Sequence, residues 1–205
     1  MNYIILITLL LTLIAIITGV IFAFKKIRRV YFFLILIMVI ASPIVVFKIY
    51  ERDFKISVVP DALQVSSISY VEEKSSGFGP GCNGAGIRVY PLSEKIANQI
   101  TKRGMEYFNH LPENKNQQKR RWRGRYDSWN ETPVKEDRFW KQKEGGDLLL
   151  YDYICRYGFC INIDEKVVGQ ATDIINSEGN YYAYGRIGLI VVSPSKKLVI
   201  YMYNG

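Results

Sequence analysis

Three cysteines, Cys82, Cys155 and Cys160, are the residues of this sequence best able to do covalent chemistry. Only four residues separate Cys155 from Cys160, so these two thiols could face each other across a turn and bond. The sequence leaves all three pairings open. We favour a bond from Cys82, because its glycine-rich loop would gain most from a tether. The alternative to any disulfide is a set of buried, unpaired thiols.

A catalytic role for Cys82 requires a base, and His110 is the only histidine of the chain. Their spacing does not show that they lie close together, and the Cys82 loop has no signature of a cysteine hydrolase. His110 lies at the C-terminus of a predicted helix, where a histidine interacts favourably with the helix dipole. We therefore expect no catalytic residue and no enzyme activity. A Cys/His-dependent enzyme is the third functional hypothesis.

The sequence contains no paired-histidine, HExxH or four-cysteine pattern, so we expect no metal site. Residues 77–86 (GFGPGCNGAG) are rich in glycine, which allows backbone amides to approach an anion closely. This segment lacks the lysine and the serine or threonine of a phosphate-binding P-loop. We interpret it as a mobile or disulfide-tethered loop and expect no cofactor.

The densest run of charge is 119–126 (KRRWRGRY), where aromatic residues are interleaved with basic ones. In the cytoplasm this mixture would favour single-stranded nucleic acid. Outside the cytoplasm it favours an acidic protein partner or anionic lipid headgroups. A solvated loop, paired with the acidic residues that follow, is the alternative. The residues predicted to contact a partner or lipid are Lys119, Arg120, Arg121, Trp122, Arg123, Arg125, Tyr126 and Trp129.

Two apolar runs near the N-terminus, 3–24 and 30–48, predict membrane-spanning helices at about 1.5 Å per residue. The first is long enough, and the second is a little short unless Lys48 snorkels, the bilayer thins or the helix extends to Tyr50. Short basic loops remain in the cytoplasm. The turn at 25–29 is positively charged because it contains Lys25, Lys26, Arg28 and Arg29. It therefore predicts a transmembrane hairpin whose turn lies in the cytoplasm. A cleaved signal peptide is the alternative, but its basic residues would precede the apolar run.

The formal net charge of +8 is concentrated in this N-terminal region. Residues 1–50 hold five of the 27 basic residues and none of the 19 acidic ones. Residues 51–205 therefore carry 22 basic and 19 acidic residues, a net charge of only +3. The basic composition is thus a signal of membrane topology, and together with the predicted sidedness it gives no reason to expect a nucleic-acid partner.

The remaining part of the chain, 51–205, has the size of one domain. Apolar periodicity predicts helices over 91–110 and 165–177, the second capped by Asp164. Runs of β-branched residues predict strands within 53–70 and 87–90, and hairpins over 148–163 and 181–203. We therefore expect an α+β domain, with a mainly antiparallel sheet and about two helices on one face, behind the N-terminal two-helix transmembrane hairpin.

These features predict a multi-pass protein of the bacterial inner membrane with a periplasmic C-terminal domain. Of its 15 tyrosines, 12 follow residue 50, and tyrosine is common at protein interfaces. We expect a domain that binds another protein outside the cytoplasm, and more narrowly an immunity-type inhibitor of a toxin or enzyme that acts in the periplasm. The alternative is an accessory structural subunit of a cell-envelope or secretion assembly.

Overall fold

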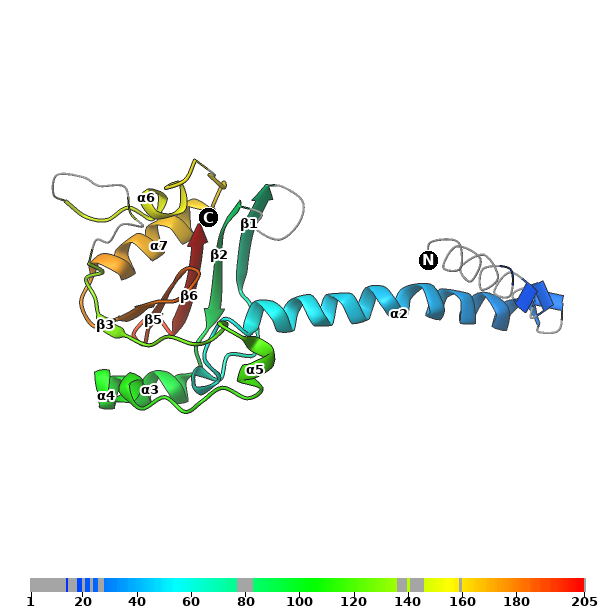
Figure 1. Ribbon diagram of the computed structural model, residues 1–205, viewed down its shortest axis with the longest axis horizontal. Helices are drawn as coiled ribbons and strands as arrows, with labels where there is room; N and C mark the ends of the chain where they lie inside the picture. The colour runs from blue at the N-terminus through cyan, green and yellow to red at the C-terminus, as the bar shows by residue number, and fades with distance from the viewer. Residues whose placement is uncertain are drawn as a thin grey trace, which may run out of the picture. The chain divides into compact units, whose positions relative to one another are not determined.

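The computed structural model describes residues 28–76, 83–135, 140, 146–158 and 160–204, together with 14, 18–19, 21–22 and 24–25. The chain divides into two compact units, Met1–Asp53 and Phe54–Gly205. Each unit is described by itself (Figure 1). Most of the first predicted span, 3–24, and part of the predicted turn lie outside the described residues.

Helix α2 (Arg29–Ile56) is long and apolar enough to cross a membrane. Its 28 residues rise about 42 Å, more than the ~30 Å hydrocarbon core of a bilayer. None of them is fully buried, and Ile56 at the end of the helix packs partly against a hydrophobic cluster. Pro43 lies inside the helix, which continues past Lys48. Among the described residues α2 is the one candidate span, so the predicted two-helix hairpin is not shown.

The second unit is built on an antiparallel sheet of six strands in the order β1-β2-β6-β5-β4-β3. This arrangement confirms the predicted α+β class and the mainly antiparallel sheet. The strands are β1 (Tyr70–Ser76), β2 (Asn83–Pro91), β3 (Trp129–Glu131), β4 (Tyr181–Tyr184), β5 (Leu189–Ser193) and β6 (Leu198–Asn204).

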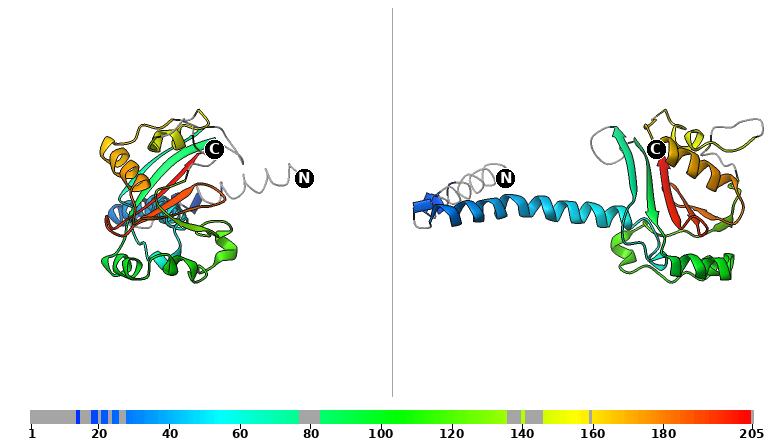
Figure 2. Two further views of the ribbon diagram at one scale, coloured as in Figure 1. Left: turned by 90° about the vertical axis from the view of Figure 1, so that its left-hand side faces the viewer. Right: turned by 180° about the vertical axis from the view of Figure 1, so that it is seen from behind.

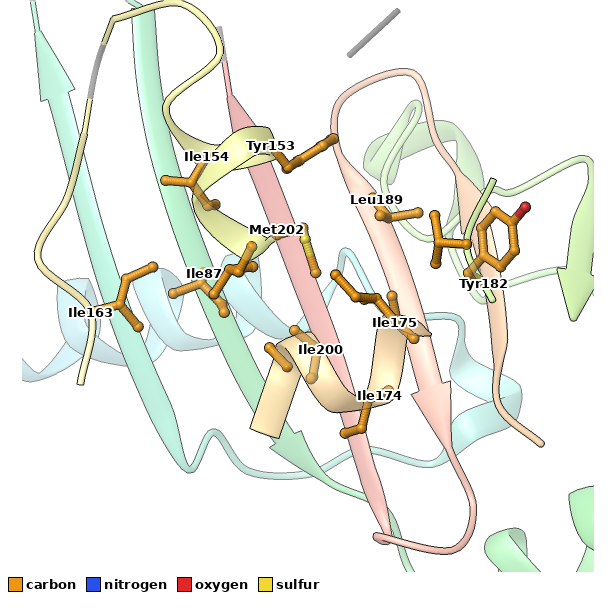
Figure 3. Packing of buried hydrophobic residues seen from close by; sticks show 14 of the residues in the cluster. Ile87, Tyr153, Ile154, Ile163, Ile174, Ile175, Tyr182, Leu189, Ile200 and Met202 are labelled. Atoms are coloured by element: carbon orange, nitrogen blue, oxygen red, sulfur yellow. The ribbon is translucent and has the colours of Figure 1, made fainter. Parts of the chain in front are cut away.

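One face of the sheet packs against α6 (Leu150–Ile154) and α7 (Glu165–Asn176). Figure 3 shows Ile154 of α6 and Ile174 of α7 in one buried cluster with the sheet residues Ile87 and Ile200. The Asp164 side chain accepts a 2.9 Å hydrogen bond from the Lys166 amide at the start of α7. The predicted helix over 165–177 and its cap are therefore confirmed.

The opposite face packs against α3 (Glu94–Arg103), α4 (Met105–Asn109) and the short helix η1 (Asp61–Leu63). Successive strand residues point to opposite faces, so Tyr90 belongs to this face whereas Ile87 belongs to the other. Helices thus cover both faces, and not one face as expected (Figure 2). The helix predicted over 91–110 is divided at Gly104, whose φ of +57° lies outside the helical range.

Two predicted β segments have other structures. Residues 53–56 complete α2, and η1 follows within the segment predicted to form two strands. Leu150, Tyr153 and Ile154 form α6 in place of a hairpin strand. Their spacings of three and four residues place all three side chains on one helical face, where all are buried. Burial of this face thus overrides the strand propensity of the segment.

Candidate functional site

The basic run predicted to contact a partner belongs to a segment, residues 117–126, that we call the basic strap. It begins with α5 (Gln117–Arg120) and packs against residues 57–61, the connection that follows α2. The Arg120 side chain is 11% exposed and forms an ion pair with Asp61. Its Nη2 donates hydrogen bonds to the carbonyls of Ser57 at 2.7 Å and Val59 at 2.9 Å. Arg120 therefore fixes the strap to the connection.

Tyr126 and Gly124 complete this attachment. The Tyr126 hydroxyl donates to the Val58 carbonyl at 2.9 Å, and burial raises the pKa of this phenol well above its ordinary value. Gly124 has a φ of +74°, and a Cβ there would lie 3.0 Å from the Ser57 carbonyl oxygen. A side chain at position 124 would thus strain the backbone and separate the strap from the connection.

Three other basic side chains of the strap face outward, whereas Arg123 is half-buried. Lys119, Arg121 and Arg125 are exposed. Arg125 and Asp127 form an ion pair at 3.3 Å, but their side chains are 70% and 82% exposed, so the pair contributes little to stability. The predicted contact residues therefore separate into side chains that hold the strap in place and side chains that it displays. Trp129 belongs to the first group, because it is buried in β3 against Phe108.

A groove that we call the strap groove lies along one side of the strap. Its smaller part, about 160 Å³, is lined partly by Arg125 and Tyr126. Its larger part, about 670 Å³, includes Ile56 and Val65. Both parts share the lining residues Pro60, Pro112 and Glu113. Aliphatic and proline side chains therefore adjoin displayed charges here.

A second hollow, which we call the aromatic cleft, has a volume of about 430 Å³. Trp122 of the strap forms part of its wall, so the strap borders both hollows. The cleft lies over the sheet face that carries Tyr90, and β2 and β6 supply much of its lining. The lining residues are Phe54, Val58, Ser75, Gly84, Arg88, Trp122, Ile187, Tyr201 and Tyr203.

Arg88 is the charged residue in the lining of the aromatic cleft. Its side chain is 7% exposed and forms an ion pair with Glu73, which also pairs with Lys55 at 3.3 Å. The guanidinium carbon lies 5.6 Å from the ring centroids of both Tyr201 and Tyr203. Burial acts to lower the pKa of Arg88, but Tyr90 and Glu73 outweigh it and raise the pKa above its ordinary value. Arg88 is therefore charged throughout the physiological range.

Glycines allow the two tyrosine rings to lie against the sheet. A Cβ at Gly86 would lie 2.5 Å from the Tyr203 ring, and one at Gly188 would lie 2.9 Å from the Tyr201 ring. The residue pattern predicted no cleft at this position. The available signal was Gly84, Gly86 and Arg88 at alternate positions, because alternate residues of a strand share one face.

The other predicted chemical residues lie apart from these hollows. The structure joins Cys155 to Cys160, in place of the favoured pairing with Cys82, and Cys82 lies outside the described residues. The turn after α6 brings the thiols of Cys155 and Cys160 together. His110 follows α4, with its Nδ1 3.3 Å from the Glu106 carbonyl oxygen. Within the described ranges, no group of histidine, cysteine or acidic residues is arranged to hold a metal ion.

Searches against protein-family models, curated proteins and solved structures find no match. No relative therefore assigns a role to any residue of the strap or of either hollow. Function has to be inferred from the geometry and charge of these surfaces.

The attachment of the strap leads to a stability prediction. Arg120→Met removes a buried donor from two carbonyls and from Asp61, and we expect it to lower the free energy of unfolding by about 1–3 kcal/mol. Arg125→Met, in the same strap but exposed, should change it by less than about 0.5 kcal/mol. Denaturant unfolding of the full chain in detergent, followed by tryptophan fluorescence, measures both. Equal midpoints for the two variants would contradict the inward role of Arg120.

Proposed function

We propose that this protein is a membrane-anchored domain that binds another protein outside the cytoplasm through the basic strap and the strap groove. The anchor is α2, within the two-helix hairpin predicted for the N-terminal region. The basic turn at 25–29 favours a multi-pass protein of the bacterial inner membrane with a periplasmic C-terminal domain.

One observation carries the binding proposal: the strap is fixed by its inner side chains while it displays its outer ones. Arg120 and Tyr126 hold its backbone, so exposed Arg121 and Arg125 stand on a segment that is already ordered. A preordered surface loses less conformational entropy on binding than a flexible loop. The displayed positive charges attract a partner with an acidic surface, and the strap groove can accept its apolar side chains.

The narrower proposal is an immunity-type inhibitor that blocks a toxin or enzyme acting in the periplasm. A tethered inhibitor must meet its target outside the cytoplasm and exclude water over a compact contact surface. The strap and its groove offer basic side chains beside aliphatic and proline residues, as such a contact requires. An acidic face on the target would complement the strap.

The second candidate is an accessory structural subunit of a cell-envelope or secretion assembly. It is favoured by the exposure of most apolar side chains of α2, which are available for contact with other membrane helices. Small residues such as Ala41 and Ser42 allow two helices to approach closely. In this case the helix itself, and not the strap, would carry the main contact.

The proposed sidedness can be measured with an alkaline phosphatase reporter, which is active only outside the cytoplasm. We expect activity when the reporter follows Asn204, and none when it is inserted after Arg28 in the basic turn. Equal expression of the two fusions is the control. Activity from the Arg28 fusion, with none from the C-terminal one, would reverse the topology and reject a periplasmic partner.

Binding through the strap can be tested by reversing its displayed charge. In Arg121→Glu/Arg125→Glu we expect retention of the protein partner from envelope extract by the immobilised full chain to fall at least about tenfold at low salt. The matched variant Lys166→Glu/Lys196→Glu makes the same charge change at exposed positions outside the strap, and should bind normally. Equal retention by both variants, or no specific retention by the native chain, would reject the strap as a binding surface.

The two candidate functions differ in their dependence on the identity of the membrane helix. We replace residues 29–48 with an unrelated apolar helix of the same length and assay partner retention in detergent. An inhibitor should retain its partner as well as the native chain does, because the strap is unchanged. Loss of the partner together with unchanged unfolding of the domain would instead favour the assembly subunit.

A further inference from the structure

The aromatic cleft takes no part in the proposed contact of the strap, yet it has the size and lining of a ligand site. Its volume of about 430 Å³ falls within the range of small-molecule pockets, roughly 300–1,000 Å³. Phe54, Trp122, Tyr201 and Tyr203 line the cleft with aromatic rings, and Ser75 and Arg88 add polar groups. A ligand bound in this cleft would therefore be largely apolar.

The chain connects this cleft directly to the proposed membrane anchor. Phe54, which lines the cleft, belongs to α2, the helix that is long and apolar enough to span a membrane. Phe54 follows Lys48, the predicted end of the span, by one and a half to two turns, or about 9 Å of helix rise. Phospholipid is therefore the apolar ligand that would be present near the cleft at the highest concentration.

The charge at the cleft favours an anion. The Arg123 guanidinium lies 4.4 Å from the centroid of the Phe54 ring. None of the ion pairs between described residues involves Arg123, and its Nε is buried without a hydrogen-bond partner. A guanidinium without a carboxylate is a natural partner for a phosphate group. A lipid with a net negative charge matches this site better than a zwitterionic one.

We infer that the aromatic cleft binds one acyl chain of an anionic phospholipid, with the lipid phosphate close to Arg123. The rings of Trp122 and Tyr203 enclose the chain, and Arg88 forms the charged part of the floor. An apolar side chain of a protein partner would match the apolar lining of the cleft as well as an acyl chain does. Lipid is favoured because Phe54, which lines the cleft, follows the predicted end of the span by only six residues of chain, whereas a protein would have to compete with lipid for the site.

Photolabelling of the full chain in nanodiscs tests this inference. The nanodiscs contain phosphatidylglycerol with a photoreactive group on one acyl chain, and labelled residues are located by mass spectrometry. We expect label on Trp122 and Tyr203 in addition to the apolar part of α2. Label confined to residues 29–53 would overturn the inference, because lipid would then contact the anchor alone.

Two neighbouring residues of β1 provide a matched pair of variants. Ser75 and Lys74 are both exposed, but adjacent strand residues point to opposite faces and only Ser75 lines the cleft. Ser75→Trp should fill the cleft and reduce its labelling about tenfold. Lys74→Trp should leave labelling unchanged. Equal labelling of the two variants would overturn the inference, provided that both unfold at the same denaturant concentration as the native chain.

The headgroup and the competing occupant are tested in separate arms. Phosphatidylcholine with the same photoreactive chain should label the cleft several-fold less than phosphatidylglycerol, and equal labelling would overturn the anionic assignment. If neither lipid labels the cleft and Ser75→Trp abolishes retention of the protein partner, the cleft belongs to the protein contact and the lipid assignment fails. Arg121→Glu/Arg125→Glu should retain lipid labelling, so this test does not depend on the proposed protein contact.

Discussion

The structure depends on hydrogen-bond donors for the backbone carbonyls in and after the last turn of α2. A helix end leaves carbonyl oxygens without partners, and an irregular connection packed against a core leaves more. Here side chains from distant parts of the chain supply the donors, namely Tyr90, Tyr107, Arg120 and Tyr126. The carbonyls that accept these hydrogen bonds belong to Lys55, Ser57, Val58, Val59 and Ala62.

The need to satisfy these carbonyls determines which side chains of the basic strap are available to bind a partner. The inward positions of the strap fix the connection, so their loss would disturb the fold before it disturbed any contact. Only the outward positions, such as Arg121 and Arg125, can meet a partner without breaking internal hydrogen bonds. The strap therefore resembles an ordered ridge more than a flexible basic tail, which favours specific recognition over nonspecific attraction.

The two faces of the sheet explain the position of the aromatic cleft. α6 and α7 bury one face, while α3, α4 and η1 bury the opposite face around Tyr90 and Val199. On that second face, Gly84 and Gly86 carry no side chain, and the Tyr201 and Tyr203 rings lie against neighbouring glycines. A hollow with aromatic walls thus remains beside the end of α2, with the ion pair of Arg88 and Glu73 at its base.

The sequence by itself determined the features that depend on local patterns. A continuous apolar run specifies α2, helical periodicity with a cap at Asp164 specifies α7, and runs of β-branched and other apolar residues specify β5 and β6. Only the tertiary structure decided that Arg120 points inward and that Arg88 lies in a cleft. The reason is physical: Arg120 and Ser57 are 63 residues apart, and local residue spacing does not encode a contact between such distant segments.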